Sequence, residues 1–154
     1  MSFTQKILAP TDFSPSSALA LDAAAILAKQ FDASVVLLYV YDPTLLSPLY
    51  VIPGASAVLE ATPRAPEFEE NARRELARLR DERLAGVSRV ELVVMQHASA
   101  AEGICAAAGT SGADLIVLST HGRTGLAHML IGSVAERVVR HAPCPVLTLR
   151  SRAK

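Results

Sequence analysis

The chain has 154 residues, of which 51% are apolar, enough for one domain with a sizeable buried core. Its 15 basic and 15 acidic residues balance, which argues against a large nucleic-acid interface. Two cysteines are too few for a disulfide framework or a structural zinc site. No apolar stretch is long enough to span a bilayer, and the N-terminus has no signal-peptide pattern. We therefore expect residues 1–154 to form a single cytoplasmic domain that binds neither nucleic acid nor membrane.

The chain begins with a strand and a helix. Lys6–Asp12 predicts a short strand ended by Pro10. Ser14 is a favourable N-cap for the helix that follows, and Pro15 loses no hydrogen bond at the first helical position. This helix extends to about Gln30 and is apolar almost all round, so we expect it to be largely buried.

A second strand and a long irregular segment come next. Ser34–Tyr41 is rich in β-branched and aromatic residues, which is typical of a strand. The pattern then dissolves over residues 42–66, which include five prolines. A loop of this length is either a variable insertion or a functional lid or partner surface containing Tyr50.

The middle of the chain predicts an amphipathic helix and an edge strand. From Glu67 to Leu84, apolar residues recur with helical spacing, and Glu69–Arg73 and Glu70–Arg74 are spaced as ion pairs on the opposite face. We interpret this charged face as solvated. Arg89–Met95 alternates and then becomes apolar, which predicts a strand at the edge of the sheet.

A helix precedes the fourth strand. Ser99 and Glu102 have the spacing of a capping box, and the helix that they open is expected to close at Gly109 and Gly112. The apolar run Leu115–Leu118 predicts a strand that is buried on both faces.

The last third contains small polar residues, a helix and a strand. After residues 119–122 and a looser segment, Ser133 and Glu136 form a second capping-box pattern, and the helix ends near His141. Cys144–Leu149 predicts the last strand, with Cys144 buried between two prolines. The alternation of strands and helices predicts an α/β fold with a parallel sheet.

One stretch resembles a known signature. Ser119-x2-Gly122-x9-Gly132-Ser133 is similar to the nucleotide-binding signature Gly-x2-Gly-x9-Gly-(Ser/Thr) of the universal stress protein family, and residues 134–147 also resemble that family. The resemblance extends from Lys6 to Arg150. It implies an open, Rossmann-like sheet of five parallel strands in the order 3-2-1-4-5, with helices on both faces. The ends of strands one and four would then meet where ligands bind such sheets.

The resemblance also implies the residues of the site. Asp12 would lie near the ribose and phosphates, and the backbone of Val40 would contact the adenine. An aspartate near a helix start is also explained by the helix dipole alone. The full set is Pro10, Thr11, Asp12, Val40, Ser119, His121, Gly122, Arg123, Gly132, Ser133 and Val134.

Several of these residues have a second interpretation. Gly122 either lets phosphate approach the backbone or serves a turn, and Arg123 either neutralises phosphate charge or is solvated. The capping box explains Ser133 fully, although a capping hydroxyl can also donate to a phosphate. Ser119 replaces the first glycine of the family pattern, and its side chain either crowds the nucleotide or hydrogen-bonds a phosphate.

The resemblance therefore implies a stress-response regulatory protein that binds ATP or a related adenine nucleotide, with Mg²⁺ bridging the phosphates. The family typically forms homodimers through the last strand, here Val146–Leu149, whose apolar edge needs cover. One alternative is a nucleotide-free dimeric stress protein that acts through protein–protein interaction. Another is a slow ATP hydrolase, for which the sequence offers no positioned base, P-loop, nucleophile elbow or metal-ligand pattern.

Overall fold

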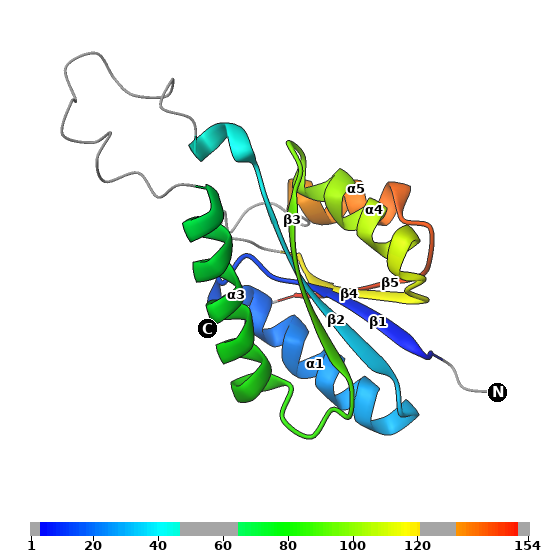
Figure 1. Cartoon of the computed structure of the whole chain (residues 1–154). Helices are drawn as coiled ribbons and strands as arrows, with labels where there is room; N and C mark the ends of the chain where they lie inside the picture. Colours follow the sequence, from blue (N-terminus) through cyan, green and yellow to red (C-terminus); the bar gives the residue numbers. More distant parts are fainter. Residues whose placement is uncertain (1–3, 47–64, 121–131, 151–154) are drawn as a thin grey trace, which may run out of the picture.

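A parallel sheet forms the centre of the protein (Figure 1). The structure, a computed structural model, describes residues 4–46, 65–120 and 132–150. In these residues the strand order is β3-β2-β1-β4-β5 with every pairing parallel, which confirms the predicted topology. The strands are β1 (Lys6–Pro10), β2 (Ser34–Tyr41), β3 (Val90–Gln96), β4 (Leu115–Ser119) and β5 (Val146–Leu149).

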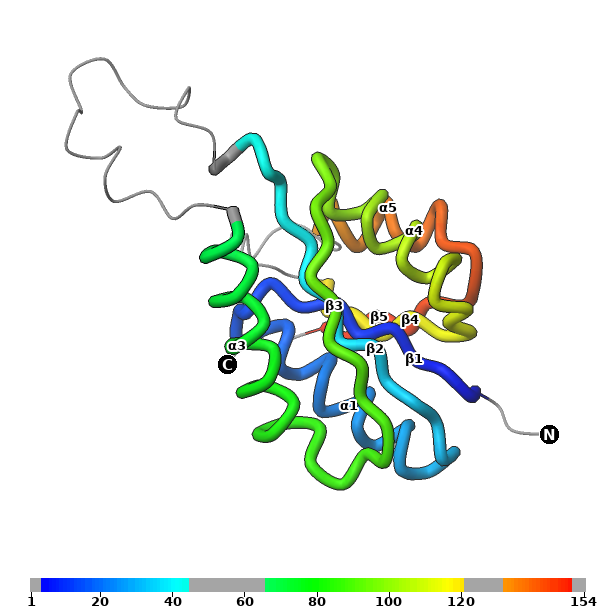
Figure 2. The backbone as a smooth tube through the Cα atoms, in the orientation of Figure 1, coloured from blue at the N-terminus to red at the C-terminus, as the bar shows by residue number. Residues whose placement is uncertain are grey.

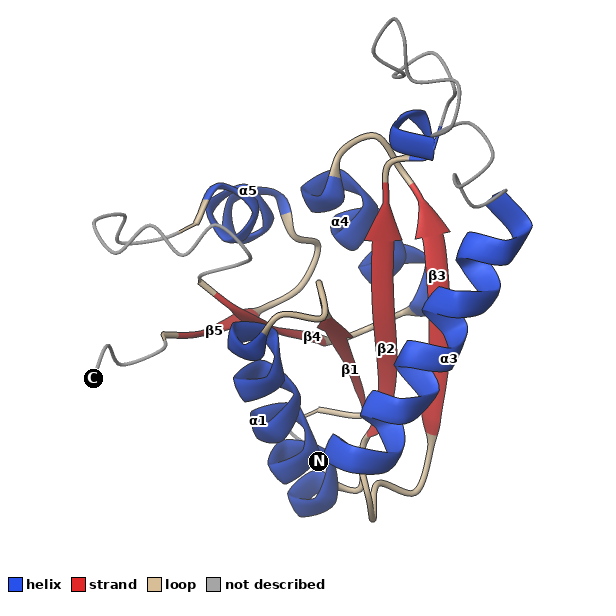
Figure 3. Cartoon of the chain, turned by 90° about the vertical axis from the view of Figure 1, so that its left-hand side faces the viewer, coloured by secondary structure: helices blue, strands red, loops and turns tan. Residues whose placement is uncertain are grey.

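Helices cover both faces of this sheet (Figures 2 and 3). One face packs against α1 (Pro15–Phe31) and α3 (Ala65–Arg83), and the other against α4 (Ala100–Ser111) and α5 (Ser133–His141). Alternate residues of each central strand enter the two cores, as Ile7 and Leu8 of β1 do. Because both faces are covered, the central strands are apolar apart from residues at their ends, such as Lys6, Ser34 and Ser119.

Helix α1 follows the predicted signals at its start. Ser14 is the N-cap, and its side chain accepts the N–H of Ser17 at 3.2 Å, while Pro15 is the first helical residue. The expected burial holds only for the inner face of the helix. Leu19 is 44% exposed and Ile26 is 68% exposed, so the apolar composition of α1 exceeds what its covered face requires.

The start of α4 is capped in a different way from the prediction. Ser99 accepts the N–H of Glu102 as expected, but the N–H of Ser99 donates to His97 Nδ1 at 3.0 Å. His97 thus takes the place that the capping box gives to the glutamate. The helix ends at Ser111, with Gly112 at φ +67° as its C-cap, so Gly109 lies within the helix instead of closing it.

The second predicted capping box is wrong. Gly132 is the N-cap of α5 and makes no side-chain hydrogen bond, so Ser133 is the first helical residue. The first intrahelical bond runs from the N–H of Glu136 to the carbonyl of Gly132, at 2.9 Å. The helix starts one residue earlier than the serine pattern indicates because the extended backbone of Gly132, at φ −67° and ψ 152°, already meets the geometry of an N-cap.

The remaining predictions concern α3, Cys144 and the segment before α3. The charge pair Glu70–Arg74 forms at 3.2 Å, whereas Glu69 accepts hydrogen bonds from Tyr41 and Gln96 of the sheet. Cys144 is half-buried, not buried, because it leads into the edge strand β5. Of residues 42–66, Pro43–Leu46 form a 3₁₀ helix.

Tyr50 lies outside the described residues. In the described part of the chain, no helix is both long and apolar enough to cross a bilayer.

Candidate functional site

A cavity of about 360 Å³ opens at the carboxyl ends of the strands. Neighbouring strands β1 and β4 lead into helices on opposite faces of the sheet, and this divergence creates a crevice, as the general rule for open α/β sheets requires. The lining residues are Pro10, Thr11, Asp12, Ser17, Val40, Ala100, Ile104, Leu118, Ser119, Thr120, Gly132, Ser133, Val134 and Ala135.

All of the sequence-predicted site residues that the structure describes line this one cavity. They are Pro10, Thr11, Asp12, Val40, Ser119, Gly132, Ser133 and Val134. The other three, His121, Gly122 and Arg123, lie outside the described residues. Sequence reasoning missed Ser17, Ala100, Ile104, Leu118, Thr120 and Ala135. Most of these are small or apolar residues whose pattern is that of the core. Two of them carry a signal: Ser17 has a hydroxyl in the first turn of α1, and Thr120 follows Ser119 in the small polar run after β4.

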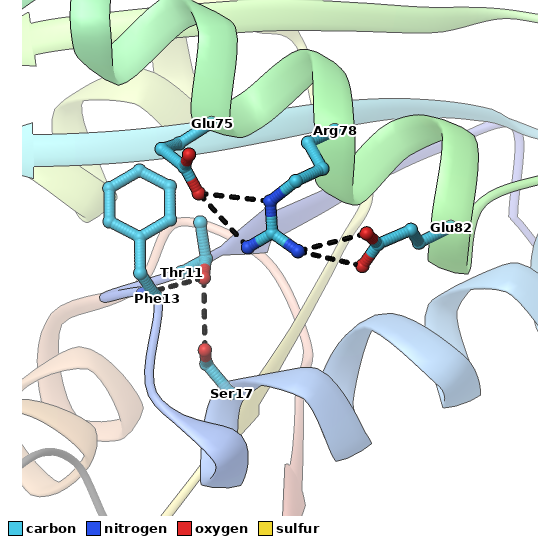
Figure 4. Close-up of polar contacts among 6 residues, drawn as sticks. All are labelled: Thr11, Phe13, Ser17, Glu75, Arg78 and Glu82. Atoms are coloured by element: carbon cyan, nitrogen blue, oxygen red, sulfur yellow. Dashed lines mark hydrogen bonds and ion pairs between the residues drawn. The ribbon is translucent and has the colours of Figure 1, made fainter.

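The turn between β1 and α1 is held by a chain of hydrogen bonds (Figure 4). The N–H of Phe13 donates to Thr11 Oγ1 at 3.0 Å, and Ser17 Oγ donates to the carbonyl of Ser14 at 2.8 Å. The hydroxyls of Thr11 and Ser17 are 2.9 Å apart. Because Ser17 already gives its proton to Ser14, Thr11 donates to Ser17. Both hydroxyl protons are therefore used, and toward a ligand these two groups offer lone pairs.

Asp12 adds a negative charge to the same wall of the cavity. Its Oδ1 accepts the N–H of Ser14 at 3.0 Å, and the residue is half-buried. Among the described lining residues it is the only one with a charged side chain. The wall formed by the β1–α1 turn thus presents hydrogen-bond acceptors and a carboxylate, which suit a ligand's donor groups or a cation.

Three helix starts contribute residues to the cavity, and they differ in capping. The side chain of Ser14 caps α1 and that of Ser99 caps α4, whereas α5 has Gly132 at its N-cap and no side-chain cap. The N–H groups of Ser133 and Val134 precede the first intrahelical bond of α5. Within the described residues, the hydroxyl of Ser133 makes no hydrogen bond. The α5 start therefore offers hydrogen-bond donors and the positive end of a helix dipole.

The third wall is apolar and is formed by Val40, Ala100, Ile104 and Leu118. Its position depends on Gly103 of α4. A Cβ at Gly103 would lie 2.7 Å from Val40 Cγ1 and 3.1 Å from His97 Cβ. The missing side chain lets α4 approach β2 closely, which brings the start of α4 to the end of the strand.

Thr120 connects the cavity to the edge of the sheet. Its carbonyl accepts the N–H of Gly132 at 2.6 Å, and its own N–H donates to the carbonyl of Leu149 at 2.9 Å. The Thr120 hydroxyl lies 3.4 Å from the same Leu149 carbonyl. One buried residue thus joins the α5 start, the end of β5 and the cavity lining.

Comparisons with known proteins agree with this architecture. The model of the universal stress protein family matches residues 4–150. Universal stress protein MJ0531 of Methanocaldococcus jannaschii is 36% identical over 150 residues, which cover 97% of this chain and 84% of the relative. The structure of hypothetical protein MJ0577 of the same organism has 28% identity and a TM-score of 0.79, covering 97% of this chain and 98% of the other. A universal stress protein solved in complex with cAMP has 24% identity, a TM-score of 0.66 and coverage of 97% and 98%, a likeness in fold alone.

Proposed function

The chain belongs to the universal stress protein family, and on this premise we propose that it binds ATP or a related adenine nucleotide in the cytoplasm, as a single-domain regulatory protein of the stress response. The observation that carries the proposal is the division of the cavity into three walls. One is apolar, one carries acceptors with a carboxylate, and one is a helix start without a side-chain cap. The parts of a nucleotide match these walls in turn.

In this arrangement the adenine packs against the apolar wall, near Val40, Ile104 and Leu118. Apolar walls with a few fixed polar groups are typical of small-molecule sites. The phosphates lie at the first turn of α5, where free N–H groups and the Ser133 hydroxyl can donate to them. The ribose lies beside Asp12, whose wall accepts hydrogen bonds.

The charge of the cavity favours a nucleotide that carries Mg²⁺. Asp12 is the only charged lining residue among those described, and its carboxylate would repel a bare phosphate chain. Mg²⁺ is commonly bound by one or two carboxylates together with substrate phosphates. The residues present fit such an ion, because Asp12 supplies the oxygen chemistry that Mg²⁺ prefers. Bound there, the ion would neutralise phosphate charge.

We also propose that two copies of the chain pair through β5. This strand is an edge of the sheet, and its residue Leu147 is 37% exposed. Val139 of the neighbouring α5 is 50% exposed. An unpaired strand edge flanked by apolar side chains is normally covered by another segment or paired with another strand. The same edge favours the alternative of a dimer that acts without nucleotide, so the function must be tested at the cavity.

The proposed function is tested by identifying the ligand that co-purifies with the protein and by measuring the effect of added nucleotide on stability. Purified protein that has not been treated with ligand is denatured, and the supernatant is analysed by ion-pair chromatography with mass detection. We expect an adenine nucleotide. For protein that purifies empty, added Mg²⁺–ATP at 100 times Kd should stabilise the fold by about 2.7 kcal/mol. An empty supernatant together with an unchanged melting temperature in ATP, ADP, AMP and cAMP would overturn the proposal.

A separate assay addresses the slow-hydrolase alternative. Steady-state phosphate release from ATP is measured for the unaltered chain and for Asp12→Ala. Since the described cavity lining contains no histidine and Asp12 is its only carboxylate, we expect no release above that of the variant. Sustained release that depends on Asp12 would show turnover.

A further inference from the structure

The turn that places Asp12 at the cavity has an unusual backbone. Phe13 has φ +63°, in the left-handed region that bulky residues rarely occupy. Among the described residues, the other non-glycine with positive φ is Asp32, at φ +52°. Asp32 is the C-cap of α1, where a left-handed residue is common. Phe13 has no such role, so its surroundings must hold it in this conformation.

Contacts hold Phe13 at both its backbone and its ring. Its N–H donates to Thr11 Oγ1 at 3.0 Å. Its ring packs on that of Tyr39, with centroids 4.6 Å apart and planes tilted by 45°. Tyr39 in turn lies 6.3 Å from the ring of Phe68 on α3. In Figure 4 the ring of Phe13 points away from Ser17, whereas its backbone N–H is directed at the Thr11 hydroxyl.

The left-handed residue Phe13 and the preceding Asp12 have different surroundings. Phe13 packs against the core between the sheet, α1 and α3, while the preceding Asp12 lines the cavity. Asp12 Oδ1 accepts the N–H of Ser14, so this hydrogen bond spans Phe13. The conformation of Phe13 therefore contributes to the direction of the Asp12 carboxylate.

We propose that Phe13 is a positioning residue for the ligand. Its ring, packed on Tyr39, keeps the turn left-handed and holds the Asp12 carboxylate at the cavity before the ligand arrives. The inference rests on the proposed nucleotide binding. Preorganisation of this kind strengthens binding because the cost of ordering the turn is met on folding. If the turn adopts the competent conformation only part of the time, the apparent affinity falls by that fraction.

The test measures Kd for Mg²⁺–ATP in a double-mutant cycle. Phe13→Gly keeps a residue that tolerates positive φ but removes the ring. A turn that is competent about one tenth of the time would raise Kd about tenfold. In an Asp12→Ala background the same change should alter Kd by less than about twofold, because the positioned group is gone. Phe13→Tyr retains the ring and should bind as the unaltered chain does.

Phe68→Leu is the matched control. Its ring belongs to the same aromatic cluster, where it pairs with Tyr39 and lies 4.9 Å from the ring of Tyr41. We expect Phe68→Leu to lower the melting temperature and leave Kd unchanged. A merely structural role for Phe13 would give its glycine variant this same pattern. If Phe13→Gly does not fold, Phe13→Asn replaces it, since asparagine also tolerates the left-handed region.

Two results would overturn the inference while leaving nucleotide binding intact. One is an unchanged Kd in folded Phe13→Gly. The other is a tenfold loss of affinity that persists in full in the Asp12→Ala background, which would mean that the ring affects binding through a group other than Asp12. If the unaltered chain binds no adenine nucleotide, the proposed function fails first and this inference fails with it.

Discussion

At Ser133, a single substitution should affect the stability of the fold and the binding of phosphate in different directions. A negative charge at the first helical position interacts favourably with the helix dipole, by about 0.3–1 kcal/mol. The same charge repels phosphate at the α5 start. We predict that Ser133→Glu leaves the melting temperature of the ligand-free protein unchanged or raises it, and weakens Mg²⁺–ATP binding by at least about tenfold.

Thermal denaturation and calorimetric titration measure these two effects. Ala106→Glu is the matched control, because Ala106 is an exposed residue of α4 that does not line the cavity. It adds the same charge and should leave Kd unchanged. Equal affinity in Ser133→Glu and the unaltered chain would place the phosphates elsewhere.

Asp114 gives the stability of the chain a defined pH dependence. Burial opposes ionisation of its carboxyl, but donation by the Thr4 hydroxyl and the backbone N–H groups of Gln5 and Lys6 outweighs it, so the pKa is lowered. The folded state thus holds the proton less tightly than the unfolded state. The contribution to stability is present above about pH 4 and is lost as the pH falls through the lowered pKa.

We predict that Asp114→Asn, which does not titrate, removes part of this acid sensitivity. Urea denaturation at pH 7 and at about pH 3 should show a smaller loss of stability in the variant than in the unaltered chain. The same loss in both proteins would assign the acid sensitivity to other groups.

Element by element, the strands and the starts of α1 and α4 could be predicted because local chemistry specifies them. Ser14 and Pro15 begin α1 as expected, and Ser99 caps α4. The start of α5 could not be located to the residue, because Gly132 and Ser133 are both acceptable N-caps. The part played by His97 at α4 depends on a contact that spacing alone does not reveal.

Alanine substitutions at two glycines of α4 should change the free energy of unfolding in opposite directions. Gly103→Ala would bring a Cβ to 2.7 Å from Val40 Cγ1, and overpacking of this kind destabilises by about 1–3 kcal/mol. Gly109 lies in the same helix, and a methyl group added to it would meet no atom within 4 Å. Gly109→Ala should therefore stabilise by roughly 0.5–1 kcal/mol through helix propensity.

Chemical denaturation of both alanine variants measures these changes. We also expect Gly103→Ala to weaken nucleotide binding, since it displaces Val40 from the apolar wall. Equal stability of the two variants would contradict the close approach of α4 to β2.

At the scale of the whole molecule, the alternation of elements was sufficient to predict a parallel α/β fold, and resemblance supplied the strand order. Of the described site residues, Ser119, Gly132 and Ser133 could be named because a glycine signature marks them, and the others followed from the family resemblance. Ile104 and Leu118 could not, since an apolar residue that lines a cavity has the same pattern as one in the core. The exposed Leu19 and Ile26 of α1 are likewise indistinguishable from buried residues in the sequence.

The proposed dimer can be tested through the backbone of β5. The carbonyls of Pro145 and Leu149 accept hydrogen bonds from β4 and the residue that follows it. Because alternate residues of a strand direct their backbone groups to the same side, the N–H of Thr148 points away from β4. Thr148→Pro should therefore preserve the monomer fold and block pairing with a second copy.

Sedimentation equilibrium should show a dimer for the unaltered chain and a folded monomer for Thr148→Pro. Leu147→Pro is the control, because its N–H lies on the β4 side and its loss should destabilise the sheet itself. A Thr148→Pro protein that remains dimeric would exclude β5 as the interface.

The central claim is that the cavity binds an adenine nucleotide with Mg²⁺, and calorimetric titration of nucleotide-free protein with ATP tests it most directly. We predict one site per chain, with affinity that falls when Mg²⁺ is chelated and when Ser133 is replaced by glutamate. A folded protein that gives no binding with ATP, ADP, AMP or cAMP, with or without Mg²⁺, would contradict the claim and favour a dimer that acts without nucleotide.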